Sequence, residues 1–95
     1  MSVEFNTADL VEIGPELIAK LKAMALDSPL KRARYCLHRT HGELIQEMVI
    51  ALHRDSYVRP HRHPILKSES YHLIEGQLDV LVFNSNGSLK KRIEL

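Results

Sequence analysis

Two histidines and one glutamate in the second half of the chain have the residue types and spacing of metal ligands. His61 and His63 flank one arginine in a segment bounded by prolines, and Glu69 follows six positions later. Side chains two positions apart on an extended backbone point to the same side, with Cα atoms about 6.5 Å apart, so both imidazoles can reach one ion. Two imidazoles and one carboxylate suit Fe(II), Mn, Ni or Zn and leave positions for water or substrate. The pattern therefore predicts a site for one divalent metal ion.

Other readings of these residues compete with the metal site. The alternative for His61 and His63 is a polar loop rim without metal. His72 has the opposite strand parity from Glu69, which argues against it as a ligand. His38 and His53 are candidates for a further ligand, although each could equally be a hydrogen-bonded structural histidine.

Composition excludes several classes of protein. The chain has 95 residues, 44% of them hydrophobic and 26% charged, which predicts one small globular domain over residues 1–95. A formal net charge of +1 gives no reason to expect nucleic acid or a membrane surface as a partner, and no apolar run approaches the ~20 residues of a membrane span. The N-terminus lacks the pattern of a secretory signal, and a lone cysteine, Cys36, predicts a cytoplasmic protein with a small buried thiol.

An N-terminal helix is predicted over residues 15–26, within a helical preface spanning residues 1–30. Pro15 suits a first helical turn, and Asp27-Ser28-Pro29 ends the element. The apolar residues between them fall on one face at helical spacing, and we expect this face to pack on the rest of the domain; they are Leu17, Ile18, Leu21, Met24 and Ala25.

From residue 33 to residue 95 the hydrophobic period changes to that of strands. Apolar residues alternate around Tyr35, around Ile50, at Leu73 and around Val80, and turn signals separate these runs. The dipeptide Asn86-Gly87 predicts a two-residue hairpin turn, followed by a returning strand over residues 89–95. The expected fold class is mainly β: a small barrel or sandwich preceded by one α-helix.

Charged and aromatic residues outside the histidine segment allow two interpretations each. Lys31, Arg32, Arg34 and Arg39 form a basic cluster that predicts a solvated face or, alternatively, a site for a sugar phosphate. Tyr57 and Tyr71 line a pocket or pack on strands. No pattern for covalent serine or cysteine catalysis is present in the sequence.

The run from Arg54 to Gly87 resembles the first conserved motif of the cupin superfamily, with His61, His63, Glu69 and Gly76 in its characteristic places. The segment from Ser56 to Pro64 resembles the WbuC-type cupin-fold metalloproteins still more closely. The predicted helix followed by Arg32-Ala33-Arg34 and His38 also resembles the opening of that family. The resemblance implies an RmlC-like jelly roll, or small cupin-type β-barrel, with the metal held by His61, His63 and Glu69 in the barrel mouth. It also implies a link to carbohydrate, because genes of this family often lie in lipopolysaccharide O-antigen clusters.

The chain departs from the cupin pattern in three ways. Asp55 stands where the motif usually has glycine, and five residues separate His63 from Glu69 where three or four are usual. A second cupin motif, which supplies another histidine, would lie beyond Leu95, so we expect a barrel that is incomplete at the C-terminus. Strands from another chain, or a local histidine, would then compensate, and the unpaired edge predicts a homodimer.

The resemblance implies a metal-binding protein of unassigned activity that acts on a sugar or sugar-nucleotide in surface-polysaccharide metabolism. An open metal position would serve as a Lewis acid or, with iron, activate O₂. The alternative is a non-catalytic module that binds a small acid or sugar, and the sequence leaves open whether the protein is an enzyme. A third possibility is a non-functional fragment.

Overall fold

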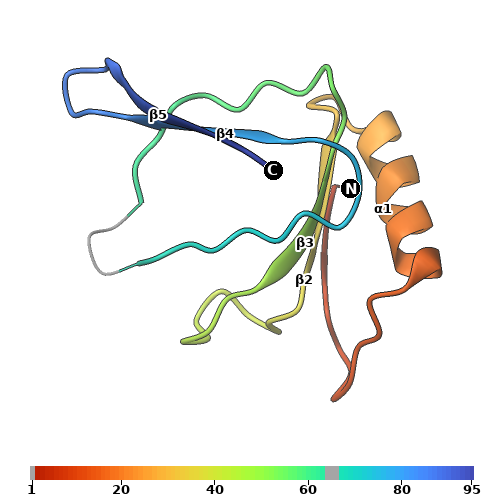
Figure 1. Ribbon diagram of the computed structural model, residues 1–95. Coiled ribbons are helices and arrows are strands. Elements are labelled where there is room, and N and C mark those ends of the chain that lie inside the picture. Colours follow the sequence, from red (N-terminus) through yellow and green to blue (C-terminus); the bar gives the residue numbers. More distant parts are fainter. Residues whose placement is uncertain (1, 64–66) are drawn as a thin grey trace. The chain divides into compact units, whose positions relative to one another are not determined.

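The protein is built mainly of small β-sheets with one helix. The computed structural model describes residues 2–63 and 67–95, in which five strands form a three-stranded and a two-stranded sheet (Figure 1). In chain order the elements are β1 (Val3–Phe5), α1 (Pro15–Asp27), β2 (Arg32–Cys36), β3 (Met48–Leu52), β4 (Asp79–Phe83) and β5 (Leu89–Glu94). The predicted class, mainly β with an N-terminal helix, is confirmed. The strands of the described residues do not close into a barrel.

The chain divides into two compact units, the first ending at Val58 and the second comprising Arg59–Leu95. The single domain expected over residues 1–95 stays a prediction. Among the described residues, no helix is long and apolar enough to span a membrane.

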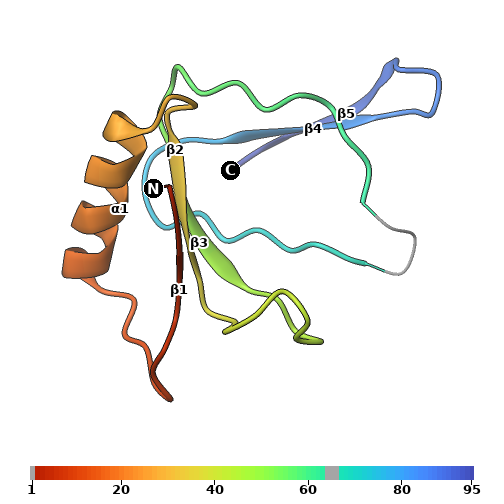
Figure 2. The same cartoon turned by 180° about the vertical axis from the view of Figure 1, so that it is seen from behind.

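The first unit is a three-stranded sheet with α1 along one of its faces (Figures 1 and 2). Strand β2 lies in the middle and pairs in parallel with β1 and antiparallel with β3. Helix α1 connects the two parallel strands, as a parallel pair requires a crossover connection. Strand β1 was not predicted, since three residues are too few to show a strand period and only pairing with β2 makes Val3–Phe5 a strand.

The helix confirms the sequence-based prediction almost to the residue. Pro15 occupies the first turn, and the backbone amide of Ser28 closes the C-terminal end on the carbonyls of Met24 and Ala25. Its apolar face packs on the sheet: Leu21 and Ala25 are buried against Ala33 and Val49. This small cluster is the core of the first unit.

The other face of the sheet carries two arginines among apolar side chains. Side chains alternate along a strand, so the residues between those that contact α1 point to the opposite side. We call this side the arginine face; its strand positions are Val3, Phe5, Arg32, Arg34, Cys36, Met48, Ile50 and Leu52. Cys36 is fully buried, which confirms the prediction of a small buried thiol, whereas Met48, Ile50 and Leu52 are 37%, 49% and 44% exposed.

The second unit contains the hairpin of β4 and β5, extended by backbone hydrogen bonds between Leu78 and Leu95. The predicted two-residue turn is wrong. The amide of Asn84 donates to the carbonyl of Ser88 at 2.8 Å, which leaves a three-residue loop with Gly87 at φ +89°. A three-residue loop of this kind ends in a left-handed residue and a bulge, and the register indeed shifts after Val82. Asn86 nevertheless stabilises the loop, since its side chain accepts the Ser88 amide.

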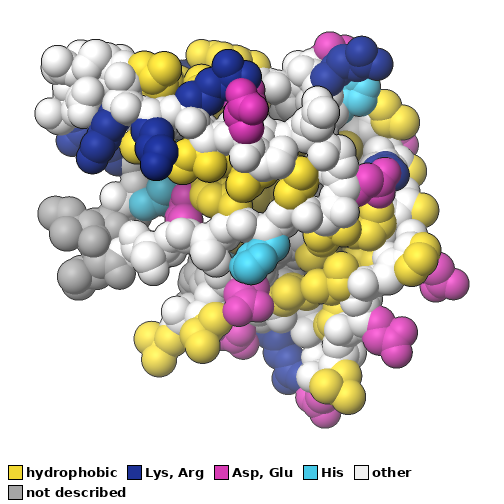
Figure 3. All heavy atoms as spheres, in the orientation of Figure 1, with side chains coloured by type: hydrophobic (Ala, Val, Ile, Leu, Met, Phe, Trp, Pro, Cys, Tyr) yellow, Lys and Arg dark blue, Asp and Glu magenta, His cyan; other side chains and the backbone are white. Residues whose placement is uncertain are grey.

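The segments on either side of the undescribed residues 64–66 form no strand. Residues 59–63 and 67–77 have no strand assignment, so the strand expected near Leu73 is absent from the described chain. A strand exists only where a neighbour completes its hydrogen-bond ladder, and hydrophobic alternation alone does not supply one. No described residue of the second unit is buried, and many apolar side chains of the protein reach the surface (yellow in Figure 3).

Candidate metal site

The three predicted ligands belong to the second unit and contact one another. The Nε2 atoms of His61 and His63 lie 3.1 Å apart, and His63 Nε2 lies 2.6 Å from Glu69 Oε1. The side chains of His63 and Glu69 are about two-fifths exposed, which leaves the group open to solvent. The three residues predicted from their spacing therefore lie close together in the structure, although they do not lie on paired strands.

The hydrogen bonds fix which nitrogen of each ring carries the proton. His61 Nδ1 lies 2.8 Å from the backbone carbonyl of Arg59, an acceptor, so Nδ1 is the donor and Nε2 keeps its lone pair in the neutral ring. His63 Nε2 faces a carboxylate and donates to it. A histidine held through Nδ1–H on a carbonyl, with Nε2 free, is the usual arrangement of a metal ligand.

Tyr71 holds the carboxylate from the other side. Its hydroxyl donates to Glu69 Oε2 at 2.5 Å, so the two carboxylate oxygens have different partners. The hydrogen bond to Glu69, helped by partial burial and by the carboxylate charge, raises the pKa of Tyr71 from 10.0 to about 12. The sequence left Tyr71 as a pocket-lining or packing residue; its position two residues after Glu69, on the same parity, was the signal for this contact.

The types of the donor atoms fit a metal ion, but His63 and Glu69 are spaced as a hydrogen-bonded pair. Metal–nitrogen bonds of about 2.1 Å place neighbouring donors about 3.0–3.4 Å apart, as the two imidazoles are. The 2.6 Å contact of His63 with Glu69 is a hydrogen bond and is shorter than that. Accordingly, no group of three or more His, Cys, Asp or Glu in the described residues has the arrangement of a metal centre. For an ion to bind, the His63–Glu69 pair would have to open slightly, and the proton on His63 Nε2 would have to move to Nδ1 of the same ring.

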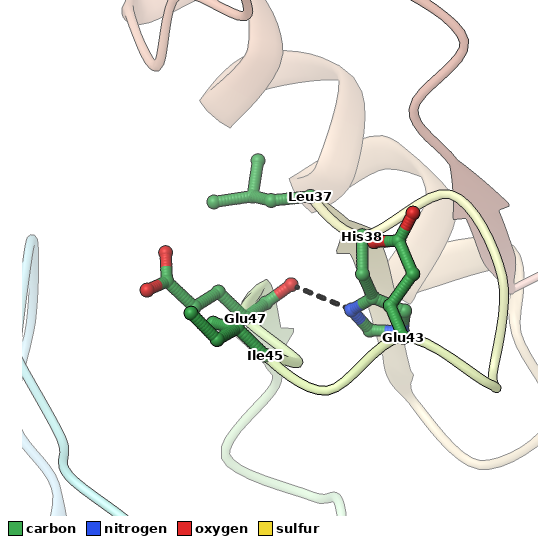
Figure 4. A pocket seen from close by; sticks show the side chains of 5 residues that line it. All are labelled: Leu37, His38, Glu43, Ile45 and Glu47. Carbon is green, nitrogen blue, oxygen red and sulfur yellow. Dashed lines mark hydrogen bonds between the residues drawn. The ribbon is translucent and has the colours of Figure 1, made fainter.

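The two candidates for a further ligand lie in the first unit and have partners of their own. His38 is 4% exposed, and its Nδ1 lies 3.1 Å from the carbonyl of Glu47 at a pocket of about 170 Å³ (Figure 4). The Glu47 carboxylate points away from His38 in this view. His53 Nδ1 accepts the amide of Asp55 at 3.1 Å. Both are hydrogen-bonded structural histidines, as the alternative interpretation had it.

The basic cluster breaks up in the structure. Lys31 donates to the carbonyl of Leu26, and Arg39 pairs with Asp9 on an exposed loop. Only Arg32 and Arg34 share a face, as members of the arginine face. The four cations therefore have different surroundings, and the solvated face favoured from the sequence stays a prediction.

The chain belongs to a family described as a domain of unknown function, DUF6016, whose profile matches residues 13–95. The matched region begins just before α1 and includes His61, His63 and Glu69. No curated protein and no solved structure matches the chain.

Proposed function

We propose that this protein binds one divalent metal ion, Fe, Mn, Ni or Zn, through His61, His63 and Glu69. The observation that carries the proposal is the orientation of His61. Its Nδ1–H is anchored on the Arg59 carbonyl, so its Nε2 lone pair faces Nε2 of His63, which in turn contacts Glu69. His63 would hold an ion through Nε2 with its proton on Nδ1, and Tyr71 would continue to orient the Glu69 carboxylate.

We further propose a cupin-type jelly roll that is completed by a second copy of the chain. A two-stranded hairpin is marginally stable in water, and no described residue of the second unit is buried. Leu81 and Phe83, 49% and 40% exposed, lie on one face of this hairpin, and Ile93, 39% exposed, pairs with Val80 on the other. Each face therefore gives further strands apolar side chains to cover. A homodimer that exchanges or adds strands would supply that cover.

The proposed role is that of a cytoplasmic metalloprotein acting on a sugar or sugar-nucleotide in surface-polysaccharide metabolism. The likeness to WbuC-type cupins supports the carbohydrate link. When bound, the ion would supply an open Lewis-acid position for oxygen ligands. The protein's own contribution is to hold the donors and to leave one side of the site, about two-fifths exposed, accessible to a small molecule.

Metal content measured by elemental mass spectrometry tests the proposal on protein purified without chelator or affinity tag. We expect near-stoichiometric metal in the native protein and its loss in His61→Ala and His63→Ala. His72→Ala is the matched control, because His72 is an exposed histidine of the same unit that lies outside the contact group. Absence of metal from the native protein, with no binding of added Fe, Mn, Ni or Zn in a titration, would refute it.

A comparison of turnover with ligand binding then separates an enzyme from a binding module. Sugar-nucleotides and small acids are screened for a shift of the thermal midpoint with and without metal. Metal-dependent product formation identifies an enzyme, whereas metal-dependent ligand stabilisation without any product supports the non-catalytic module.

A further inference from the structure

Arg34 lies at the centre of the arginine face and has one covered side-chain nitrogen, Nε. It stands opposite Val3 on β1 and Ile50 on β3. Its Nε is covered by protein and makes no hydrogen bond to any described residue. A buried donor without an acceptor costs about 1–3 kcal/mol, and more for a charged group, so such a group needs a reason to be kept.

The arginine face has positive charge and no acidic residue among its strand positions. Arg32 and Arg34 are its two charged members, and the acidic residue of β1, Glu4, lies on the other face and pairs with Lys20. The Arg32 guanidinium donates to a neutral group, the backbone carbonyl of Tyr57, at 3.2 Å. Neither charge is therefore neutralised by a carboxylate on this face.

The surroundings of Arg34 strengthen its attraction for an anion. A guanidinium offers two parallel N–H groups that match the geometry of a carboxylate or a phosphate. The Nε atom is covered by protein while the residue as a whole remains partly exposed, so part of Arg34 is still accessible from solvent. Nearby Met48, Ile50 and Leu52 are 37–49% exposed and can contact a hydrocarbon portion.

We propose that the arginine face binds a small organic oxyanion, with Arg34 making the bidentate contact, Arg32 adding charge, and the apolar side chains of β3 covering the rest of the ligand. This site lies wholly in the first unit and goes beyond the proposed metal site. Charge complementarity favours an anionic small molecule over a purely apolar occupant of the face.

Thermal unfolding of the full chain with two probe anions tests the proposal. Inorganic phosphate and butyrate are titrated separately at constant ionic strength against chloride, so that the phosphate and carboxylate sources are distinguished. We expect one of them to raise the thermal midpoint saturably, and butyrate to act more strongly than acetate if the ligand is a carboxylate. Arg34→Gln should weaken the apparent affinity at least about tenfold, since a hydrogen bond to a charged group is worth about 1.5–3 kcal/mol.

Controls separate a binding role from a structural one. Arg54→Gln removes the same charge from an exposed position of the same unit and should leave the anion effect unchanged. In chloride, Arg34→Gln should be at least as stable as the native protein, because it removes an unsatisfied buried donor. Arg34→Lys keeps the positive charge but lacks the two parallel N–H groups of the guanidinium, so it should also bind the anion weakly. His63→Ala should bind the anion normally, which keeps this test independent of the metal site.

Three results would overturn the proposal. The first is the absence of a saturable shift with either anion, and the second is an equal shift in Arg34→Gln. The third is a native dimer that Arg34→Gln converts to monomers in sedimentation, since the face would then be covered by a second copy of the chain.

Discussion

The ionisation of Tyr71 gives a direct test of the contacts that define the candidate metal site. Its hydroxyl donates to Glu69 Oε2, and this bond is the main cause of a pKa of about 12 in place of 10.0. Replacing Glu69 by glutamine removes the carboxylate charge and its strong acceptor. We therefore expect the pKa of Tyr71 in Glu69→Gln to fall by as much as two units, back toward 10.0.

The size of this change can be measured from tyrosinate absorbance. In a variant in which Tyr35 and Tyr57 are replaced by phenylalanine, Tyr71 is the only chromophore of this kind. At about pH 11, a phenol with a pKa near 12 is about one-tenth ionised, whereas one with a pKa near 10 is about nine-tenths ionised. The metal-free parent and its Glu69→Gln counterpart should thus differ about tenfold in tyrosinate at that pH. Circular dichroism at the same pH confirms that both remain folded.

The sign of the accompanying stability change follows from the raised pKa. Folding favours the neutral phenol of Tyr71, so the stabilisation is fully present below about pH 10 and is lost as the pH rises through about 12. Equal tyrosinate absorbance in the two variants across this range would show that Tyr71 does not contact Glu69 in solution. The part of the candidate site formed by Glu69 and Tyr71 would then be wrong.

Further predictions concern the metal site, the core and the hairpin. Glu69→Gln should weaken metal binding in a titration with the added ion, because a neutral amide oxygen would replace the carboxylate ligand of the candidate metal site. Leu21→Ala should lower the free energy of unfolding by about 2–5 kcal/mol in urea titrations, since Leu21 is 1% exposed, whereas Leu26→Ala on the same helix, 54% exposed, should change it by less than about 0.5 kcal/mol. Gly87→Ala should cost about 1 kcal/mol and accelerate hydrogen exchange in the hairpin, because Gly87 has φ +89°; Gly14→Ala, at φ −127° with free space around the added methyl, should have a smaller effect.

Local patterns predicted those parts of the fold that local interactions determine. The helix at Pro15–Asp27 follows from a proline at its start and an apolar face at helical spacing, and β3 at Met48–Leu52 follows from alternation. Residues near Leu73 alternate in the same way but form no strand. The difference is a pairing partner, which no stretch of sequence contains within itself.

In the candidate metal site, too, some features could be predicted from the sequence and others required the structure. Residue types and spacing predicted that His61 and His63 lie close together, because side chains two apart share a side of an extended backbone, and the structure places Glu69 beside His63. Metal binding by these residues stays a prediction. The role of Tyr71, and the choice of His61 Nδ1 as donor to the Arg59 carbonyl, required the positions of the acceptors. Hydrogen-bond geometry depends on tenths of an ångström, which residue spacing does not define.

The sequence by itself determined the helix, the hairpin region and the burial of Cys36, all of which depend on residue type and short-range period. The members of the candidate metal site stay a prediction. Only the tertiary structure decided that β1 joins the sheet, that the hairpin loop has three residues, and that Arg34 lies without an acid on its face. Each of these depends on which distant segment lies beside which, and that is set by strand register and packing across the sheet.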